Sequence, residues 1–317
     1  MSVPLRLTRS MLFVPAGRWP MIEKAAASAA DAVCLDLEDS VAPADKAAAR
    51  TNIVRAFREL DFGTRVRMFR MNALDTPFAY RDLIEVVEGA GDRIDLVMLP
   101  KAGSPGDVAF VDTLLTQIEL GHGFAAPIGI EAQIETASGF LYAREIAQAS
   151  PRLEGLIFGP GDFAASMQMP LASIGEFDPH DHTYPGHRWH AVMQAIVAAA
   201  RANGLRAMDG PFAAFRDAEG FERSARIARG LGFDGKQCIH PAQLEAANRI
   251  FAPEPAEVEH ARRVVEAYEQ SVSAGRGAAA LDGHMIDAAN IRMARVILDK
   301  WQRARNRHNS TAPLTQI

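Results

Sequence analysis

The chain has 317 residues, of which 48% are hydrophobic and 23% are charged, and its formal net charge is −5. This composition is typical of a globular protein with a large core, and the length suits one α/β barrel. The slight acidic excess argues against a protein that binds nucleic acid or a membrane surface. No segment approaches the roughly 20 apolar residues of a membrane span, and the N-terminus lacks the features of a signal peptide. We therefore expect a cytoplasmic protein with neither nucleic-acid nor membrane partners.

The only two cysteines, Cys34 and Cys238, lie in apolar runs that resemble strands. They do not form the C-x-x-C spacing of a metal or redox motif. We interpret them as buried free thiols of a protein from a reducing compartment.

Short apolar runs alternate with longer amphipathic segments along most of the chain, as in successive βα units. The eight runs are Ser10–Pro15, Ala32–Glu38, Arg65–Asn72, Leu96–Lys101, Pro127–Glu135, Leu153–Pro160, Arg206–Phe212 and Gly235–His240. Helical patterns lie between them, for example at Trp19–Ala30, Pro43–Leu60, Pro105–Leu120 and Asp217–Leu231. The order predicts an α/β fold, a TIM (β/α)8 barrel. An open doubly wound sheet is the alternative, but residues 14–18 lack its glycine-rich fingerprint.

Two segments exceed the eight units. A polar insertion covers residues 168–187, and about 75 residues follow His240. This tail shows helical patterns at Pro255–Ser273 and Ile286–Arg305 with a short run, Ala278–Leu281, between them. We therefore divide the chain into a barrel domain, residues 1–250, and a C-terminal helical extension, residues 251–317. We interpret the extension as a lid or an oligomer contact and expect disorder in its last dozen residues.

Two carboxylates end neighbouring apolar runs, and they are the strongest functional signal in the chain. Glu135 closes the fifth run, and Asp162 follows the Gly-Pro-Gly turn after the sixth. Residues at the carboxyl ends of barrel strands face the active site. Mg²⁺ is held by one or two protein carboxylates with water and substrate in its other positions. The pair predicts a magnesium site, and the alternative is that each acid caps the helix that follows it.

The third run alternates with period two, which places Val66, Met68 and Arg70 on one face. The apolar start of this face predicts that it lines the barrel interior, with Arg70 at the top. An inward arginine needs an anionic partner, because a buried unpaired charge costs several kcal/mol. The partner is an anionic substrate or an internal carboxylate, Asp36 or Glu38, and the two can coexist.

The fifth run carries Glu131, Gln133 and Glu135 on one face, which predicts an internal charge network beneath the metal. Lys101 and His240 end the fourth and eighth runs. Arg18 and Lys24 follow the first run, where they suit an anion at the rim or simple surface charge.

Four histidines, His180, His182, His187 and His190, lie within eleven residues and offer a competing zinc site. They fall mostly in the polar insertion and no cysteine accompanies them. A surface loop followed by a helix from about Arg188 is therefore the preferred interpretation.

Taken together, the motifs resemble the HpcH/HpaI aldolase and citrate lyase β-like family, and within it the malyl-CoA and β-methylmalyl-CoA lyases. The matching stretches run through nearly the whole chain. They are Arg9–Pro15, Leu35–Ser40, Gly129–Thr136, Phe158–Phe163, Tyr184–Gly186 with Trp189–His190, Met208–Phe212, Gly235–Lys236 with Ile239–Pro241, and Leu281–Asp287.

The resemblance implies Mg²⁺ on Glu135 and Asp162, with Mn²⁺ as a possible substitute. It implies catalytic roles for Arg70, which contacts substrate, and for Asp282, which transfers a proton from a lid donated to a neighbouring subunit. A homotrimer or homohexamer follows from such a lid. The remaining implied contacts are with the CoA thioester, the 2-oxo acid or their supporting groups, and the residues are Phe13, Arg18, Lys24, Glu38, Asp39, Gly161, Asp162, Ile239 and His240.

The implied reaction is the reversible, Claisen-type cleavage of malyl-CoA, or β-methylmalyl-CoA, to glyoxylate and acetyl-CoA, or propionyl-CoA. Three alternatives remain open. They are a (3S)-malyl-CoA thioesterase, a citramalyl-CoA lyase that releases pyruvate, and a citrate lyase β-like subunit that acts on an acyl-carrier partner.

Overall fold

The computed structural model describes residues 6–171, 173–177, 180–181, 188–273, 275 and 278–311, with side chains as far as residue 306. The chain divides into two compact units, Met1–Arg249 and Ile250–Ile317. Each unit is described by itself. In the described residues, no helix is both long enough and apolar enough to cross a membrane.

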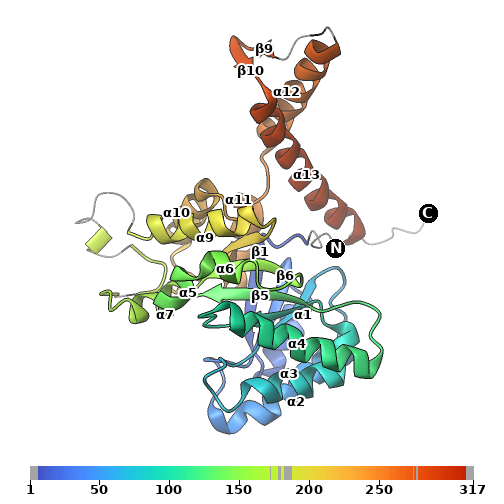
Figure 1. The fold of residues 1–317 in the computed structure, drawn as a ribbon, viewed down its shortest axis with the longest axis vertical. Helices are drawn as coiled ribbons and strands as arrows, with labels where there is room; N and C mark the ends of the chain where they lie inside the picture. The colour runs from blue at the N-terminus through green and yellow to red at the C-terminus, as the bar shows by residue number, and fades with distance from the viewer. Residues whose placement is uncertain are drawn as a thin grey trace. The chain divides into compact units, whose positions relative to one another are not determined.

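The first unit is a closed barrel of eight parallel strands in sequence order, with β1 paired to β8 (Figure 1). Each strand run predicted from the sequence forms a strand, so the predicted TIM barrel is confirmed. The strands are β1 (Ser10–Pro15), β2 (Ala32–Asp36), β3 (Val66–Arg70), β4 (Leu96–Leu99), β5 (Gly129–Ile134), β6 (Leu153–Phe158), β7 (Arg206–Asp209) and β8 (Gly235–Cys238).

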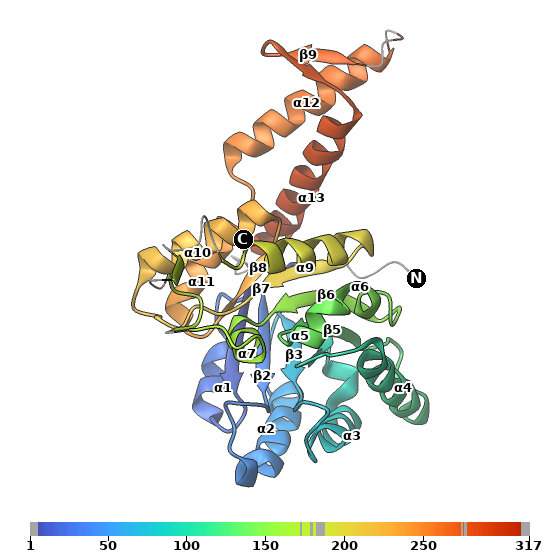
Figure 2. The same cartoon turned by 60° about the vertical axis from the view of Figure 1, so that its left-hand side comes forward.

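Helices follow the strands in the sequence and lie on the outside of the barrel, as α1 to α4 do in Figure 2. The α-helices of this unit are α1 (Trp19–Ala26), α2 (Lys46–Glu59), α3 (Ala79–Ala90), α4 (Pro105–His122), α5 (Ala137–Leu141), α6 (Ala143–Ile146), α7 (Pro160–Ser166), α9 (His190–Ala202), α10 (Ala218–Leu231) and α11 (Leu244–Ile250). Short 3₁₀ helices are η1 (Pro43–Asp45), η2 (Gly91–Arg93) and η3 (Pro241–Gln243).

The barrel interior is apolar over one part and charged over another. The apolar part includes Val66 and Met68, so the predicted inward face of β3 is confirmed. In the charged part, Arg206 of β7 lies 2.8 Å from Glu131 and 3.0 Å from Glu154, all buried. The predicted charge network on the polar face of β5 is therefore present. Because its charges are paired, the network can remain buried below the carboxyl ends of the strands.

The second unit is a small helical cluster that also contains a hairpin. Its helices are α12 (Pro255–Ser273) and α13 (Ala288–Thr311), and its strands are β9 (Ala279–Leu281) and β10 (His284–Ile286). Ile286 and Ile291 pack against Val264 of α12 in a small core. Helix α13 continues to Thr311, and the expectation of disorder in the last dozen residues otherwise falls outside the described residues.

The sequence placed most strand ends two or three residues too far. Glu38, Lys101, Glu135 and His240 follow their strands instead of ending them. This difference is physical: ladder hydrogen bonding stops where the chain turns away, although the buried run continues. Glu38, Lys101 and Glu135 therefore lie on the loops just beyond the barrel strands, where functional sites of such barrels are built.

Candidate active site

Glu135 is buried directly after β5, with 1% of its surface exposed. Its Oε1 accepts a hydrogen bond from the backbone N–H of Lys101 at 2.8 Å, and its Oε2 accepts one from the Gln133 amide at 2.5 Å. Burial, followed by the nearby charges of Glu38 and Asp162, raises the pKa of Glu135 to about 8. The two hydrogen bonds fix the carboxylate, while its surroundings disfavour its charge unless a cation is near.

Asp162 lies in the first turn of α7, and its side chain is 40% exposed. The N-cap of α7 is Gly159, and the N-cap of α5 is Thr136, whose hydroxyl accepts from Gly139 N–H. Neither Glu135 nor Asp162 therefore caps the following helix. Both carboxylates remain available to a ligand. The alternative interpretation of the sequence, in which each acid caps the following helix, is therefore wrong.

Arg70 joins β3 to the acidic turn after β2. Its Nε and Nη2 donate to the two oxygens of Asp36 at 2.6 and 2.8 Å, and its Nη1 lies 2.7 Å from Glu38 Oε2. Both internal partners considered from the sequence are therefore present at once. Burial opposes the charge of Asp36, but the Arg70 charge and its hydrogen bonds outweigh this and lower the pKa of Asp36. The guanidinium is thus held rigidly beside the carboxylates.

Lys101 follows β4 and contacts three of these acids. Its Nζ lies 2.6 Å from Glu38, 3.6 Å from Asp39 and 3.7 Å from Asp162. Burial opposes its charge, but the hydrogen bond to Glu38 and the surrounding carboxylates dominate and raise the pKa of Lys101. Its backbone has a left-handed φ of 49°, which is uncommon for a residue other than glycine.

These contacts link five carboxylates to two cations. The carboxylates are Asp36, Glu38, Asp39, Glu135 and Asp162, and the cations are Arg70 and Lys101. The excess negative charge and the raised pKa of Glu135 fit a divalent cation with oxygen ligands. Among the described residues, no three His, Cys, Asp or Glu side chains converge as a metal cage. The set therefore suits an ion that keeps water or substrate in several positions, as Mg²⁺ does.

Gly159 lies against the buried carboxylate. A Cβ at Gly159 would come within 2.3 Å of Glu135 Oε2 and 2.8 Å of Gln133 Nε2. Real Cβ atoms do not approach other atoms this closely, so a glycine is needed where this loop passes Glu135. The Gly-Pro-Gly turn noted in the sequence thus shapes the site.

Of the residues that the resemblance associates with CoA, Phe13 is the one joined to the acidic cluster by a described contact. The Arg70 guanidinium lies 5.3 Å from the Phe13 ring centroid. Arg18 immediately precedes α1, Lys24 lies in the last turn of this helix, and both side chains are exposed. Ile239 and His240 are exposed after β8, and the His240 ring stacks on Phe215 at 4.7 Å. Gly161 is half-buried beside Asp162.

Asp282 belongs to the second unit. It lies in the turn between β9 and β10 with a φ of 51°, is exposed, and pairs with Arg263 of α12 at 2.6 Å. Its proton-transfer role stays a prediction.

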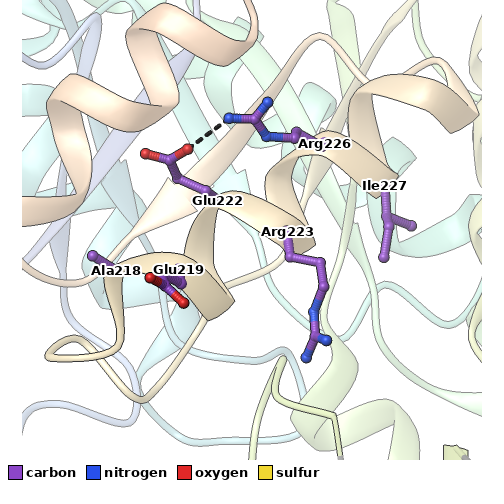
Figure 3. Close-up of a pocket in the computed structure, with 6 residues that line it drawn as sticks. All are labelled: Ala218, Glu219, Glu222, Arg223, Arg226 and Ile227. Carbon is purple, nitrogen blue, oxygen red and sulfur yellow. Dashed lines mark hydrogen bonds and ion pairs between the residues drawn. The ribbon is translucent and has the colours of Figure 1, made fainter.

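The remaining candidates are weaker. His182 and His187 of the competing zinc set lie outside the described residues, as do residues 172, 178–179 and 182–187 of the polar insertion. A hollow of about 520 Å³ runs along α10, where Glu222 pairs with Arg226 (Figure 3). Among the described residues, those that line this hollow all belong to α10, and none of them is a predicted site residue.

Residues 9–241 match the HpcH/HpaI aldolase/citrate lyase family. The chain belongs to this family. It is 46% identical over 303 residues to the L-malyl-CoA/β-methylmalyl-CoA lyase of Cereibacter sphaeroides, covering 93% of this chain and 95% of that one. It is 37% identical to the (3S)-malyl-CoA thioesterase of the same species, covering 92% and 94%.

This chain also resembles a solved structure. The CitE protein of Mycobacterium tuberculosis, in complex with magnesium, acetoacetate and coenzyme A, matches with a TM-score of 0.73 and 33% identity. The match covers 92% of this chain and 97% of that one. The recognised family, the barrel and the likeness to these lyases are thereby confirmed.

Sequence reasoning gave no role to Lys101 and treated Asp36 only as a possible partner of Arg70. Both are central to the cluster. Their position in the sequence was the available signal. Each lies near the carboxyl end of a predicted strand run, close to a residue already chosen as a site candidate.

Proposed function

We propose that this chain is a carbon–carbon lyase that reversibly cleaves malyl-CoA or β-methylmalyl-CoA. The products are glyoxylate and acetyl-CoA or propionyl-CoA. The observation that carries the proposal is the buried carboxylate of Glu135 at the carboxyl end of the barrel strands. Glu38 and Asp162 lie near it, and Arg70 is held in place beside it. The high identity to the Cereibacter sphaeroides lyase supports this substrate class.

Glu135 and Asp162 would hold Mg²⁺, with Mn²⁺ as an alternative ion. When bound, the ion supplies Lewis-acid stabilisation and a template for the 2-oxo acid. Gly161 and Asp162 would contact that acid from the first turn of α7. The magnesium in the related Mycobacterium tuberculosis structure supports this assignment.

Arg70 stabilises the negative charge that develops on the substrate oxygen at the reacting carbon. Its guanidinium is positioned before substrate arrives, because Asp36 and Glu38 bind three of its nitrogen atoms. A preorganised donor of this kind needs little reorganisation during the reaction, which is the source of its catalytic benefit. Asp39 supports the same cluster through Lys101.

The CoA thioester would lie across the β1 and β8 ends of the site. Phe13 offers an apolar surface next to Arg70, while Arg18 and Lys24 supply positive charge for the phosphates. Ile239 and His240 would contact the thioester or the nucleotide from the loop after β8.

Asp282 would transfer the proton at the acyl carbon. In cleavage its carboxyl group donates a proton to the acetyl-CoA enolate, and in synthesis its carboxylate removes a methyl proton. Such a weak carbon acid requires a desolvated base, but Asp282 is exposed in its own unit. We therefore propose that the C-terminal unit covers the site of a neighbouring subunit in a homotrimer or homohexamer.

The thioesterase relative is the reason to keep a second candidate. In that case the same site would direct water to the thioester and release malate and free CoA. A citramalyl-CoA lyase would release pyruvate, and a citrate lyase β-like subunit would require an acyl-carrier partner.

Product analysis with (S)-malyl-CoA, Mg²⁺ and the purified protein tests the proposal, with a parallel reaction in EDTA. Equal amounts of glyoxylate and acetyl-CoA, lost on chelation, are expected. Malate with free CoA would instead establish the thioesterase. Pyruvate from citramalyl-CoA, without turnover of malyl-CoA, would overturn the substrate assignment.

A further inference from the structure

We propose that Lys101 is the internal counter-cation of the metal site, and that metal binding displaces its ammonium group from Asp162 towards a neighbouring cavity. This inference rests on the metal assignment of the proposed function and adds a residue to it. The contacts of Lys101 connect both proposed metal ligands, because its backbone binds Glu135 while its side chain lies near Asp162.

The backbone of Lys101 suggests that its side chain has a use. A left-handed φ of 49° is sterically unfavourable for a lysine, and a glycine would adopt it at lower cost. The conformation directs the N–H towards Glu135, which a glycine would achieve equally well. The lysine side chain adds an ammonium group, which binds Glu38 at 2.6 Å. Strained residues at functional sites are often kept for such a contact.

The ammonium and a divalent cation compete for the same negative charge. Nζ lies 3.7 Å from Asp162 Oδ1, so a metal ion on that oxygen would face a like charge at short range. Among the residues that the structure describes, Lys101 and Arg70 are the cations that form ion pairs with these carboxylates, and Arg70 is committed to Asp36. A third cation, Lys46, lies next to the cluster, but its ammonium group is held by the backbone carbonyls of Leu37 and Glu38. Lys101 is the less buried of the two, because its side chain is 27% exposed against 11% for Arg70.

A cavity beside the cluster gives the displaced ammonium a place to go. It has a volume of about 410 Å³, and Lys101 itself lines it together with Glu38, Asp39 and Asp75. Lys46 lines it as well, so the three carboxylates outnumber the one cation already present there. The ammonium can therefore leave Asp162 and still face carboxylates. This arrangement lets Lys101 neutralise the acids of the metal-free protein without blocking the metal-bound one.

The experiment is calorimetric titration of the metal-free protein with Mg²⁺, without substrate, in K101M, K101R and the wild type. K101M keeps the backbone hydrogen bond to Glu135 but removes the competing charge. Its affinity for Mg²⁺ is expected to increase by about tenfold, which is the order of the repulsion between a cation and a like charge a few ångströms away at a partly exposed site. K101R retains the charge and should stay within about threefold of the wild type. K300M, altered in α13 of the second unit, is the matched lysine control, and its Mg²⁺ affinity should not change.

Unchanged or weaker Mg²⁺ binding by K101M, with normal binding by the wild type, would overturn the role of Lys101 and leave the proposed function intact. A wild type that binds no Mg²⁺ would overturn both. K101Q, which keeps a polar side chain without its charge, provides the same comparison if K101M does not fold, and its affinity should also increase.

Discussion

The backbone N–H of Lys101 lies 2.8 Å from Oε1 of Glu135, although 34 residues separate them in the chain. This hydrogen bond joins the loop after β4 to the residue after β5 and fixes one oxygen of a buried carboxylate. The other oxygen is held by Gln133 on the same strand. Glu135 is therefore oriented by its neighbours before any ligand binds, which a metal ligand requires.

Enlarging Gly159 should damage the metal site without changing any charged residue. In G159A the new methyl group would overlap Glu135 Oε2, so the carboxylate must move. We expect Mg²⁺ affinity to fall by about 10- to 100-fold, as for other losses of ligand support. G121A is the matched control, because nothing lies within 4 Å of a Cβ at Gly121 in α4. Calorimetry on both variants provides the measurement, and equal Mg²⁺ affinities would contradict the proposed role of Gly159 in the metal site.

Replacing Arg70 should separate its structural role from its catalytic role. R70M leaves Asp36 and Glu38 without their main partner, so we expect a loss of about 3–5 kcal/mol in the free energy of unfolding. R70K keeps a charge but loses the two-pronged contact with Asp36, and its kcat should fall by about 100-fold or more. Urea denaturation and steady-state rates measure these two effects.

Arg67 supplies the control on the same strand. It pairs with Asp95 at 2.9 Å, where both side chains are partly exposed. R67M should therefore cost only about 1 kcal/mol or less. If R67M and R70M were equally destabilised, the buried pairing of Arg70 would not be the cause.

Mg²⁺ binding to the free protein should strengthen with pH. The pKa of Glu135 is raised to about 8, first by burial and then by Glu38 and Asp162, so a proton occupies it below this pH. A metal ion must displace that proton. Affinity should therefore rise by up to about tenfold per unit towards pH 8 and level off above it. Titrations in buffers of different ionisation enthalpy would count the released proton.

E135Q is the control for this titration. It removes the ionisable group and one ligand charge while keeping the size of the side chain. Its Mg²⁺ binding should be weak and should lack the slope that ends near pH 8. A wild type whose affinity did not change between pH 6 and 8 would contradict the expected titration.

The sequence was sufficient for the barrel because the signals involved are local. Alternation placed Met68 and Arg70 on the inner face of β3, and turn residues separated the eight runs. Strand ends were overestimated, since a buried run continues into the loop after its ladder hydrogen bonds have ended. The hairpin strand β10 was missed because His284–Ile286 is only three residues long and mostly exposed.

The active-site contacts could be anticipated only in part. Two candidate partners for Arg70 were visible, but not that both bind it at once. The Lys101–Glu135 hydrogen bond uses a backbone group, which every residue carries, so no side-chain pattern could reveal it. Such contacts depend on how the loops after neighbouring strands turn, and this is a property of the tertiary structure.

The role of Asp282 can be tested separately from the metal site. D282N keeps the size of the side chain and suits the left-handed backbone, since asparagine tolerates positive φ. We expect turnover to fall by about 100-fold or more, because general acid–base catalysis is lost. Mg²⁺ affinity should be unchanged, because the metal ligands belong to the other unit.

D299N is the matched control for this substitution. Asp299 is an exposed acid of α13 that pairs only with Arg303 one helical turn away among the described contacts. Removing such a surface pair has little effect on stability, so D299N should keep wild-type turnover. If D282N retained full activity, proton transfer would have to come from another group, which would contradict the proposed catalytic role of the C-terminal unit. If D299N lost as much activity as D282N, general damage to the C-terminal unit would explain both.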